Sequence, residues 1–364
     1  MNTNFHQWYL CAEKKYYNIW LAYDQNKNDL VNGFKHIEYV IDNELIKVLQ
    51  NIKKPKTHPT YIQSLIVDRL KKIRKQYQTL RFLYSGGTDS FTILKLAIEN
   101  NIFIDETITH LVSFTDNPKC NIEYLWGIKY AKQYEGTHIG KVTVIKPNIK
   151  DVDYYHNQQW WLDESIVRGS PLWLRGQNIC KYLPAKSNHS TITITGHDKP
   201  TLFVDNKQIF WCILDNPISE YMGIDSIYHI FCDKNNPELI ASQTYAFLDA
   251  CPNLQNGYVN IDCFDAYKRL DLLDKLGLFK TGKPYLDKAL IGKKSFNKSL
   301  NNINFLKELK NLNHMTYSEV YNSHLEIFHR YKDVPYGVHF KNNFVESVGR
   351  FSKKIPIYQD SFGS

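Results

Sequence analysis

The alternation of strand and helix patterns between residues 80 and 195 constrains the fold of this 364-residue chain more than any other feature. Short apolar runs predict strands, and the segments between them carry apolar residues at three- and four-residue steps, the period of a helix. The predicted strands are 80–84, 107–114, 141–146 and 191–195, and the predicted helices are 88–100, 121–134 and, interrupted near Gly169, 154–182. Strands separated by helices form parallel β–α–β units, so we expect an α/β fold with a parallel sheet and flanking helices.

The sequence on either side of this stretch suggests three regions, 1–77, 78–235 and 236–364. The first region has mixed short elements. Helices are predicted at 43–49 and 61–77, and a basic, proline-containing break separates them at 53–59. The second region is the α/β stretch, and we expect it to end in a hairpin formed by 202–204 and 208–214. The third region is mostly helical by pattern. These N-terminal and helical C-terminal additions resemble no family, and we expect them to shape a substrate pocket or an oligomer interface.

The composition argues against several classes of protein. The longest apolar runs have about six residues, whereas a membrane-spanning helix needs roughly 20. The N-terminus has no basic segment followed by an apolar one, and none of the 7 cysteines forms a Cys-x-x-Cys pair. A secreted disulfide scaffold and a zinc ribbon are therefore disfavoured, and we expect a cytoplasmic protein without membrane contacts. The net charge of +8 allows an anionic partner but does not require one.

The most informative motif lies between the first predicted strand and the helix after it, and reads Ser85-Gly86-Gly87-Thr88-Asp89-Ser90. The glycines permit tight turns and let a ligand approach the main chain. The first amides of a helix have no acceptor inside the helix, and the helix dipole adds partial positive charge, so the segment can cradle an oxyanion. The three hydroxyls can add donors, and Asp89 is suited to hold a magnesium ion that bridges phosphate oxygens. The alternative is a structural turn whose polar side chains only cap the helix.

This motif resembles the SGGxDS pyrophosphate-binding loop of the N-type ATP pyrophosphatases, the PP-loop superfamily, and it lacks the Gly-Lys-Ser/Thr end of a Walker A loop. Superfamily members include asparagine synthetase, GMP synthetase and several tRNA-modifying enzymes. The resemblance covers about residues 80–214. It implies a Rossmann-like sheet of the adenine nucleotide α-hydrolase type, with ATP and Mg²⁺ as cofactors. It also implies cleavage of ATP between the α- and β-phosphates, with transfer of AMP to a substrate oxygen.

Two further segments are compatible with this resemblance. The predicted second strand ends at Phe114, and family members bind adenosine at that point, so Phe114 and Asp116 are candidate nucleotide contacts. The fourth predicted strand ends in Thr195-Gly196-His197-Asp198-Lys199-Pro200. There Gly196 and His197 are candidate phosphate contacts, Asp198 a second metal ligand, and Lys199 a catalytic cation. The alternative for both segments is an ordinary polar turn.

Basic residues elsewhere supply weaker candidates. Arg168 and Arg175 flank the predicted helix break and are suited to clamp pyrophosphate or an acidic substrate. Lys283, Lys293 and Lys294 lie in glycine-containing loops, where a lysine could approach the leaving group. The alternative in each case is a solvated surface side chain.

The resemblance implies a reaction type but leaves the acceptor open. Our first hypothesis is an AMP-forming ligase that adenylates a carboxylate or carbonyl oxygen, which an amine then attacks. The second is a tRNA- or nucleobase-modifying enzyme, favoured by the basic run from Lys71 to Lys75 and by an aromatic content of 14%. The simpler explanation of the aromatic content is an AT-rich genome. The missing Cys-x-x-Cys pairs disfavour the zinc-dependent deazapurine-forming and the iron–sulfur branches. A third hypothesis is a non-catalytic nucleotide-binding protein.

Overall fold

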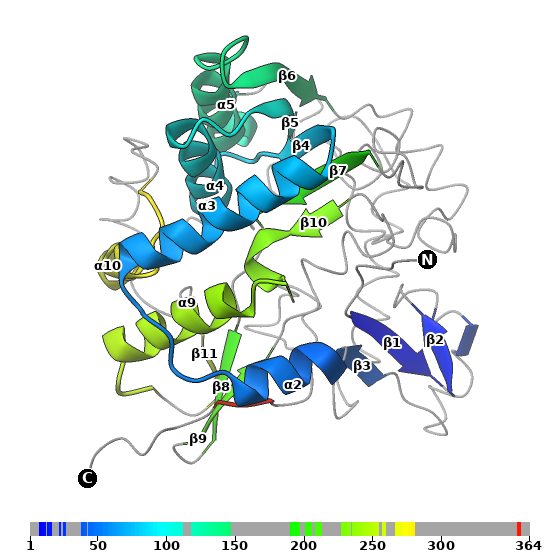
Figure 1. Cartoon of the computed structure of the whole chain (residues 1–364), viewed down its shortest axis with the longest axis vertical. Helices are drawn as coiled ribbons and strands as arrows, with labels where there is room; N and C mark the ends of the chain where they lie inside the picture. The colour runs from blue at the N-terminus through cyan, green and yellow to red at the C-terminus, as the bar shows by residue number, and fades with distance from the viewer. Residues whose placement is uncertain are drawn as a thin grey trace.

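The computed structural model describes fifteen stretches of the chain, which include most of the α/β region (Figure 1). They are residues 7–11, 13–16, 22, 25–26, 38–41, 43–111, 118–146, 190–196, 201–205, 208–212, 227–233, 235–254, 257–259, 266–280 and 355–357. The predicted helix 154–182 and nearly all of the predicted helical segment after residue 280 lie outside them.

The predicted parallel sheet is confirmed, and it has five strands in the order β10-β7-β4-β5-β6. Figure 1 shows these strands running from β6 at the top to β10 near the middle. All four pairings are parallel. The strands are β4 (Thr79–Leu83), β5 (Ile104–His110), β6 (Ile139–Ile145), β7 (Thr191–Thr195) and β10 (Ile227–His229). The chain adds β5 and β6 on one side of β4, then returns to add β7 and β10 on the other, which is the Rossmann-like strand order.

Two strands differ from the prediction. The sequence pattern missed β10, because three residues are too short to show a periodicity. It also placed the second strand at 107–114, whereas β5 begins at Ile104 and ends at His110. The first residues of β5 include two acidic side chains, Asp105 and Glu106, and both have basic partners in the fold. Asp105 accepts the Leu80 amide at 2.7 Å and pairs with Arg74, and Glu106 lies 3.2 Å from the Arg81 Nε.

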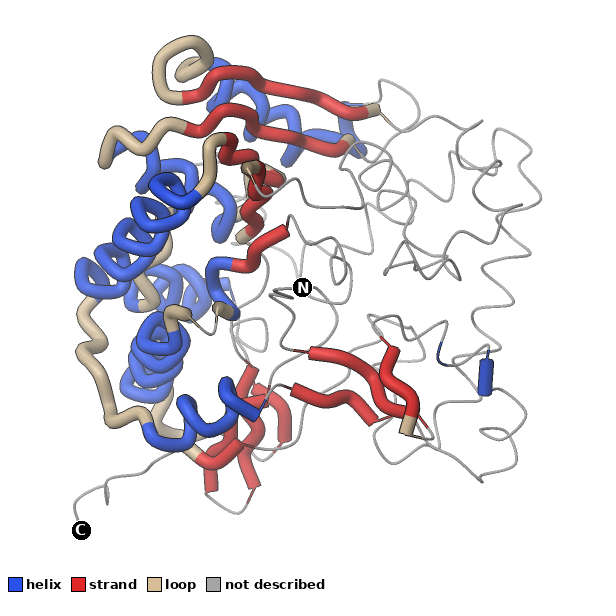
Figure 2. Tube along the Cα trace, turned by 45° about the vertical axis from the view of Figure 1, so that its right-hand side comes forward, coloured by secondary structure: helices blue, strands red, loops and turns tan. Residues whose placement is uncertain are grey.

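The helices around this sheet agree well with the periodicity of their apolar residues. α3 (Pro59–Gln76) precedes β4, α4 (Thr88–Glu99) connects β4 to β5, and α5 (Pro118–Lys132) connects β5 to β6. Two further helices follow the sheet, α9 (Pro237–Ala250) and α10 (Ala266–Lys275). In Figure 2 most of the helices lie together along the left side of the chain. None of the helices in the described stretches has the length and apolarity needed to cross a membrane.

Two smaller antiparallel sheets accompany the central one. The first has the order β2-β1-β3 and comprises β1 (Gln7–Cys11), β2 (Lys14–Tyr16) and β3 (Glu38–Ile41). The second has the order β11-β8-β9-β12, with β8 (Thr201–Asp205), β9 (Gln208–Cys212), β11 (Gly257–Val259) and β12 (Ile355–Pro356). β8 and β9 form the predicted hairpin, with Asp205 opposite Gln208. The predicted helix at 43–49 is also confirmed, as α2 (Asn43–Asn51).

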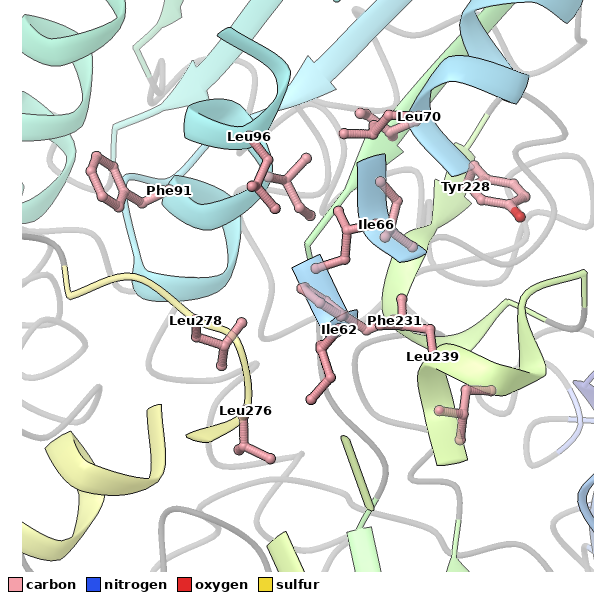
Figure 3. Packing of buried hydrophobic residues seen from close by; sticks show 14 of the residues in the cluster. Ile62, Ile66, Leu70, Phe91, Leu96, Tyr228, Phe231, Leu239, Leu276 and Leu278 are labelled. Carbon is pink, nitrogen blue, oxygen red and sulfur yellow. The ribbon is translucent and has the colours of Figure 1, made fainter. Parts of the chain in front are cut away.

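One hydrophobic cluster joins residues from all three predicted regions. Figure 3 shows Ile62, Ile66 and Leu70 of α3 among side chains from α4, β10, α9 and the segment after α10. An ion pair also connects the basic break before α3 with α9, since the Lys54 Nζ lies 2.6 Å from the Asp249 carboxylate. The buried contacts therefore cross the predicted boundaries at residues 77 and 235, and the division into three domains stays a prediction.

Candidate functional site

The motif Ser85–Ser90 lies at the one place in the sheet where the strand order reverses direction. It follows β4, whose neighbours are β5, the next strand in the chain, and β7, to which the chain returns later. In α/β sheets generally, the connections that leave the carboxyl ends of the two strands at such a point diverge and leave a crevice between them. In α/β sheets, ligands bind in this crevice. The topology thus places the motif where the sequence prediction requires it.

The backbone of the loop has the conformation that its glycines permit. Gly86 has a φ of +74°, in the left-handed region that residues other than glycine rarely adopt. Gly87 is extended and forms the N-cap of α4, and the first helical hydrogen bond runs from the Phe91 amide to the Gly87 carbonyl at 2.8 Å. The amides of Thr88, Asp89 and Ser90 therefore have no acceptor inside α4 and lie at the positive end of its dipole. This is the geometry of an anion cradle.

The two serine hydroxyls stabilise the loop itself. The Gly87 amide donates to the Ser85 Oγ at 3.2 Å, and the Ser90 hydroxyl donates to the Gly87 carbonyl at 3.1 Å. The two Oγ atoms are 3.1 Å apart, and since the Ser90 hydrogen is engaged, Ser85 is the donor between them. The sequence predicted these hydroxyls as donors to a ligand. In this structure they form a hydrogen-bonded ring within the loop, so both serine hydroxyls are already engaged there.

Gly196, at the end of β7, touches the start of α4. A Cβ atom on Gly196 would lie 3.0 Å from the Ser90 nitrogen, 3.1 Å from the Asp89 carbonyl carbon and 2.9 Å from the Ile93 Cδ1. The absence of a side chain therefore allows β7 to approach the loop at main-chain distance. The sequence singled out the two segments separately, and the fold brings them together.

The remaining predicted site residues fall outside the described residues. They are Phe114, Asp116, Arg168, Arg175, His197, Asp198 and Lys199, together with the lysines Lys283, Lys293 and Lys294. The strand boundary that selected Phe114 and Asp116 was wrong, because β5 ends at His110. His110 is buried, 7% exposed, and shares a sheet face with Arg81 and Leu83 of β4.

Asp89 is the only carboxylate in the loop, and it is half-buried. Within the described stretches, no three or more His, Cys, Asp or Glu side chains gather as a metal site would require. Mg²⁺ is commonly held by one or two protein carboxylates together with substrate phosphates and water, rather than by a dedicated protein cage. A single carboxylate beside an anion cradle fits that mode of binding.

The basic run of α3 lies near the amino ends of the strands, opposite the end that carries the loop. Lys71, Lys72 and Lys75 are exposed near the C-terminus of α3, and this helix leads directly into the amino end of β4. Arg74 of the same run pairs with Asp105. The Ser85–Ser90 loop follows the carboxyl end of β4, so these lysines do not surround the candidate site.

A segment after α10 contacts the helix that carries the loop, which sequence patterns did not reveal. The Phe279 amide donates to the Thr92 Oγ1 at 2.9 Å, and the Thr92 hydroxyl donates to the Thr88 carbonyl at 2.8 Å. The Lys95 ammonium lies 4.4 Å from the centre of the Phe279 ring. Thr92 is fully buried, so the hydroxyl that connects the C-terminal region to the first turn of α4 is shielded from water.

Replacing Thr92 by valine should lower the free energy of unfolding by about 1–3 kcal/mol, because the Phe279 amide loses its acceptor in a buried environment. Denaturant unfolding of the full chain measures this change. The serine variant keeps the hydroxyl and should recover most of the hydrogen-bonding contribution. A loss for serine with little or none for valine would mean that the methyl group, and not the hydroxyl, stabilises this contact.

No protein-family model matches the chain, and no curated protein shows significant similarity to it.

Proposed function

We propose that this protein binds Mg·ATP at the Ser85–Ser90 loop and transfers AMP to an oxygen of a substrate, with release of pyrophosphate. The observation that carries the proposal is the position of the loop. A left-handed glycine and the N-terminus of a helix lie at the strand-order reversal of a parallel sheet, and the residue that follows β7 touches the helix start. The SGGxDS pattern adds the reaction type, since it resembles the pyrophosphate loop of the PP-loop superfamily.

The chemistry requires positioned charges rather than a protein nucleophile. The acceptor oxygen attacks the α-phosphorus, the bond from this phosphorus to the α–β bridging oxygen breaks, and its electron pair leaves with pyrophosphate. Negative charge develops on the leaving group, next to the amides of Thr88, Asp89 and Ser90 at the N-terminus of α4. Preorganised donors of this kind lower the barrier because they need no reorganisation during the reaction. When bound, Mg²⁺ would neutralise phosphate charge, and Asp89 would hold it, with Asp198 proposed as a second ligand.

The products of ATP turnover test this reaction type. The full chain is incubated with Mg²⁺, ATP labelled at the α-phosphate, and a panel of carboxylates, amides and amines. Release of AMP and pyrophosphate with any acceptor supports the proposal, and release of ADP and phosphate contradicts it. ATP binding without cleavage across the whole panel would favour the non-catalytic alternative. RNA binding that weakens steeply with salt would favour the RNA-modifying alternative.

A further inference from the structure

A glycine in the middle of α5 has no local reason to be there. Gly127 lies inside the helix and is buried. Within a helix, glycine costs roughly 0.5–1 kcal/mol relative to alanine, because it loses more backbone freedom on folding. An isolated glycine in a helical pattern therefore points to a close approach that a Cβ atom would prevent.

The close approach is to the candidate nucleotide loop. A Cβ atom on Gly127 would lie 2.8 Å from the Gly86 Cα, 3.2 Å from the Gly86 nitrogen and 3.2 Å from the Tyr84 Cε1. The first two are main-chain atoms, which cannot rotate away as the end of a flexible side chain can. Any residue larger than glycine at position 127 must therefore displace Gly86 or move α5 outward.

Gly86 is the residue on which the loop geometry depends. Its φ of +74° turns the chain from β4 toward the amides that open α4. At the other end of the loop, a Cβ atom on Gly196, the residue after β7, would lie 3.0 Å from the Ser90 nitrogen and 3.1 Å from the Asp89 carbonyl carbon. The two ends of the loop are thus each held by a main-chain contact, one from α5 and one from β7.

We propose that Gly127 is a positioning residue for the nucleotide site, an inference that rests on the proposed function. Its missing side chain lets α5 pack on Gly86 and fixes the left-handed turn, so the amides of the first turn of α4 are already oriented when phosphate binds. Gly127 itself does not touch the nucleotide. The proposal assigns to it the preorganisation of the loop, which lowers the cost of binding.

The test compares Gly127→Ala with a glycine variant of equal steric severity elsewhere. A Cβ atom on Gly140 would lie 2.7 Å from the Asp105 carbonyl oxygen, at the amino end of β6 and away from the loop. Titration calorimetry of the full chain with Mg·ATP and with inorganic pyrophosphate gives the affinities, and thermal unfolding gives the stability. We expect Gly127→Ala to weaken both ligands by about tenfold or more, which corresponds to about 1.4 kcal/mol. Gly140→Ala should lower the melting temperature yet keep the affinities within about twofold of the wild type.

Several outcomes distinguish this inference from the proposed function. If the wild type binds neither ligand, the proposed function fails. If the wild type binds and Gly196→Ala weakens binding while Gly127→Ala does not, Gly127 is a packing residue only and the inference is overturned. Should Gly127→Ala fail to fold, amide hydrogen exchange of the wild type decides. Mg·ATP should then slow exchange in residues 126–130 as well as in the loop, and unchanged exchange in α5 would contradict the inference.

Discussion

Replacing Asp89 by asparagine should weaken Mg·ATP binding or turnover by about a hundredfold or more, the size seen when one preorganised electrostatic contact is removed. Asparagine keeps the shape of the side chain and removes the negative charge that would hold Mg²⁺ beside the phosphates. Asp89 lies in the first turn of α4, where a carboxylate also interacts favourably with the helix dipole. That contribution is only about 0.3–1 kcal/mol, so the variant should stay folded.

Two controls separate a metal-binding role from a structural one. Asp68→Asn removes an exposed carboxylate from α3 and should leave nucleotide binding unchanged. Omission of Mg²⁺ should bring the wild type and Asp89→Asn to similar, weaker affinities, because the carboxylate then has no cation to hold. Equal affinities of the two proteins in the presence of Mg²⁺ would remove Asp89 from the site.

Replacing Arg69 by methionine should lower the free energy of unfolding by about 3–5 kcal/mol, the usual cost of leaving one partner of a buried ion pair without its counter-charge. The Arg69 Nε lies 2.6 Å from the Asp233 carboxylate and 2.7 Å from the Tyr228 hydroxyl. Asp233 is only 3% exposed. This contact ties α3 to the segment that follows β10, so it stabilises the side of the sheet next to β7.

The loss should depend on pH in a defined direction. Burial raises the pKa of the Asp233 carboxyl in the folded protein, and the Arg69 charge acts against this rise. A raised folded-state pKa stabilises the fold fully below the unfolded pKa, about 3.9, and this contribution is lost as pH rises through the folded value. Without Arg69 the folded pKa rises further, so the loss caused by Arg69→Met should be larger at pH 7.5 than at pH 5.

Denaturant unfolding at both pH values measures this difference. The double variant Arg69→Met, Asp233→Asn has no buried charge at this position, so its loss relative to the wild type should be smaller and should change little with pH. A loss below about 1 kcal/mol for Arg69→Met, within the range of exposed ion pairs, would contradict the interpretation of a buried pair.

Local sequence patterns predicted much of the central sheet. The bounds of β7 agree fully with the TITIT run, and α4 and the hairpin differ from the prediction by a few residues at most. β5 was misplaced because the neutralisation of Asp105 and Glu106 depends on Arg74, Arg81 and Leu80, which no local pattern connects with them.

For the candidate site, the sequence predicted the position of the motif but not its tertiary contacts. The Ser85–Ser90 motif could be located in the sequence because its glycines and hydroxyls are contiguous. Its contacts could not be predicted. Gly127 contacts the loop through the packing of α5, and Phe279, in the segment after α10, donates a hydrogen bond to Thr92 of α4. A glycine inside a predicted helix was the one available signal of such a contact.

Backbone amide chemical shifts of the full chain, recorded with and without Mg·ATP, test the central claim most directly. The account predicts that the largest changes fall on Gly86, Gly87, Thr88, Asp89 and Ser90, with a smaller change at Gly196. Inorganic pyrophosphate should reproduce the changes in the loop, and the exposed lysines of α3 should show none. If calorimetry confirms that ATP binds but the amides of residues 86–90 do not change, the nucleotide site lies elsewhere and the account is wrong.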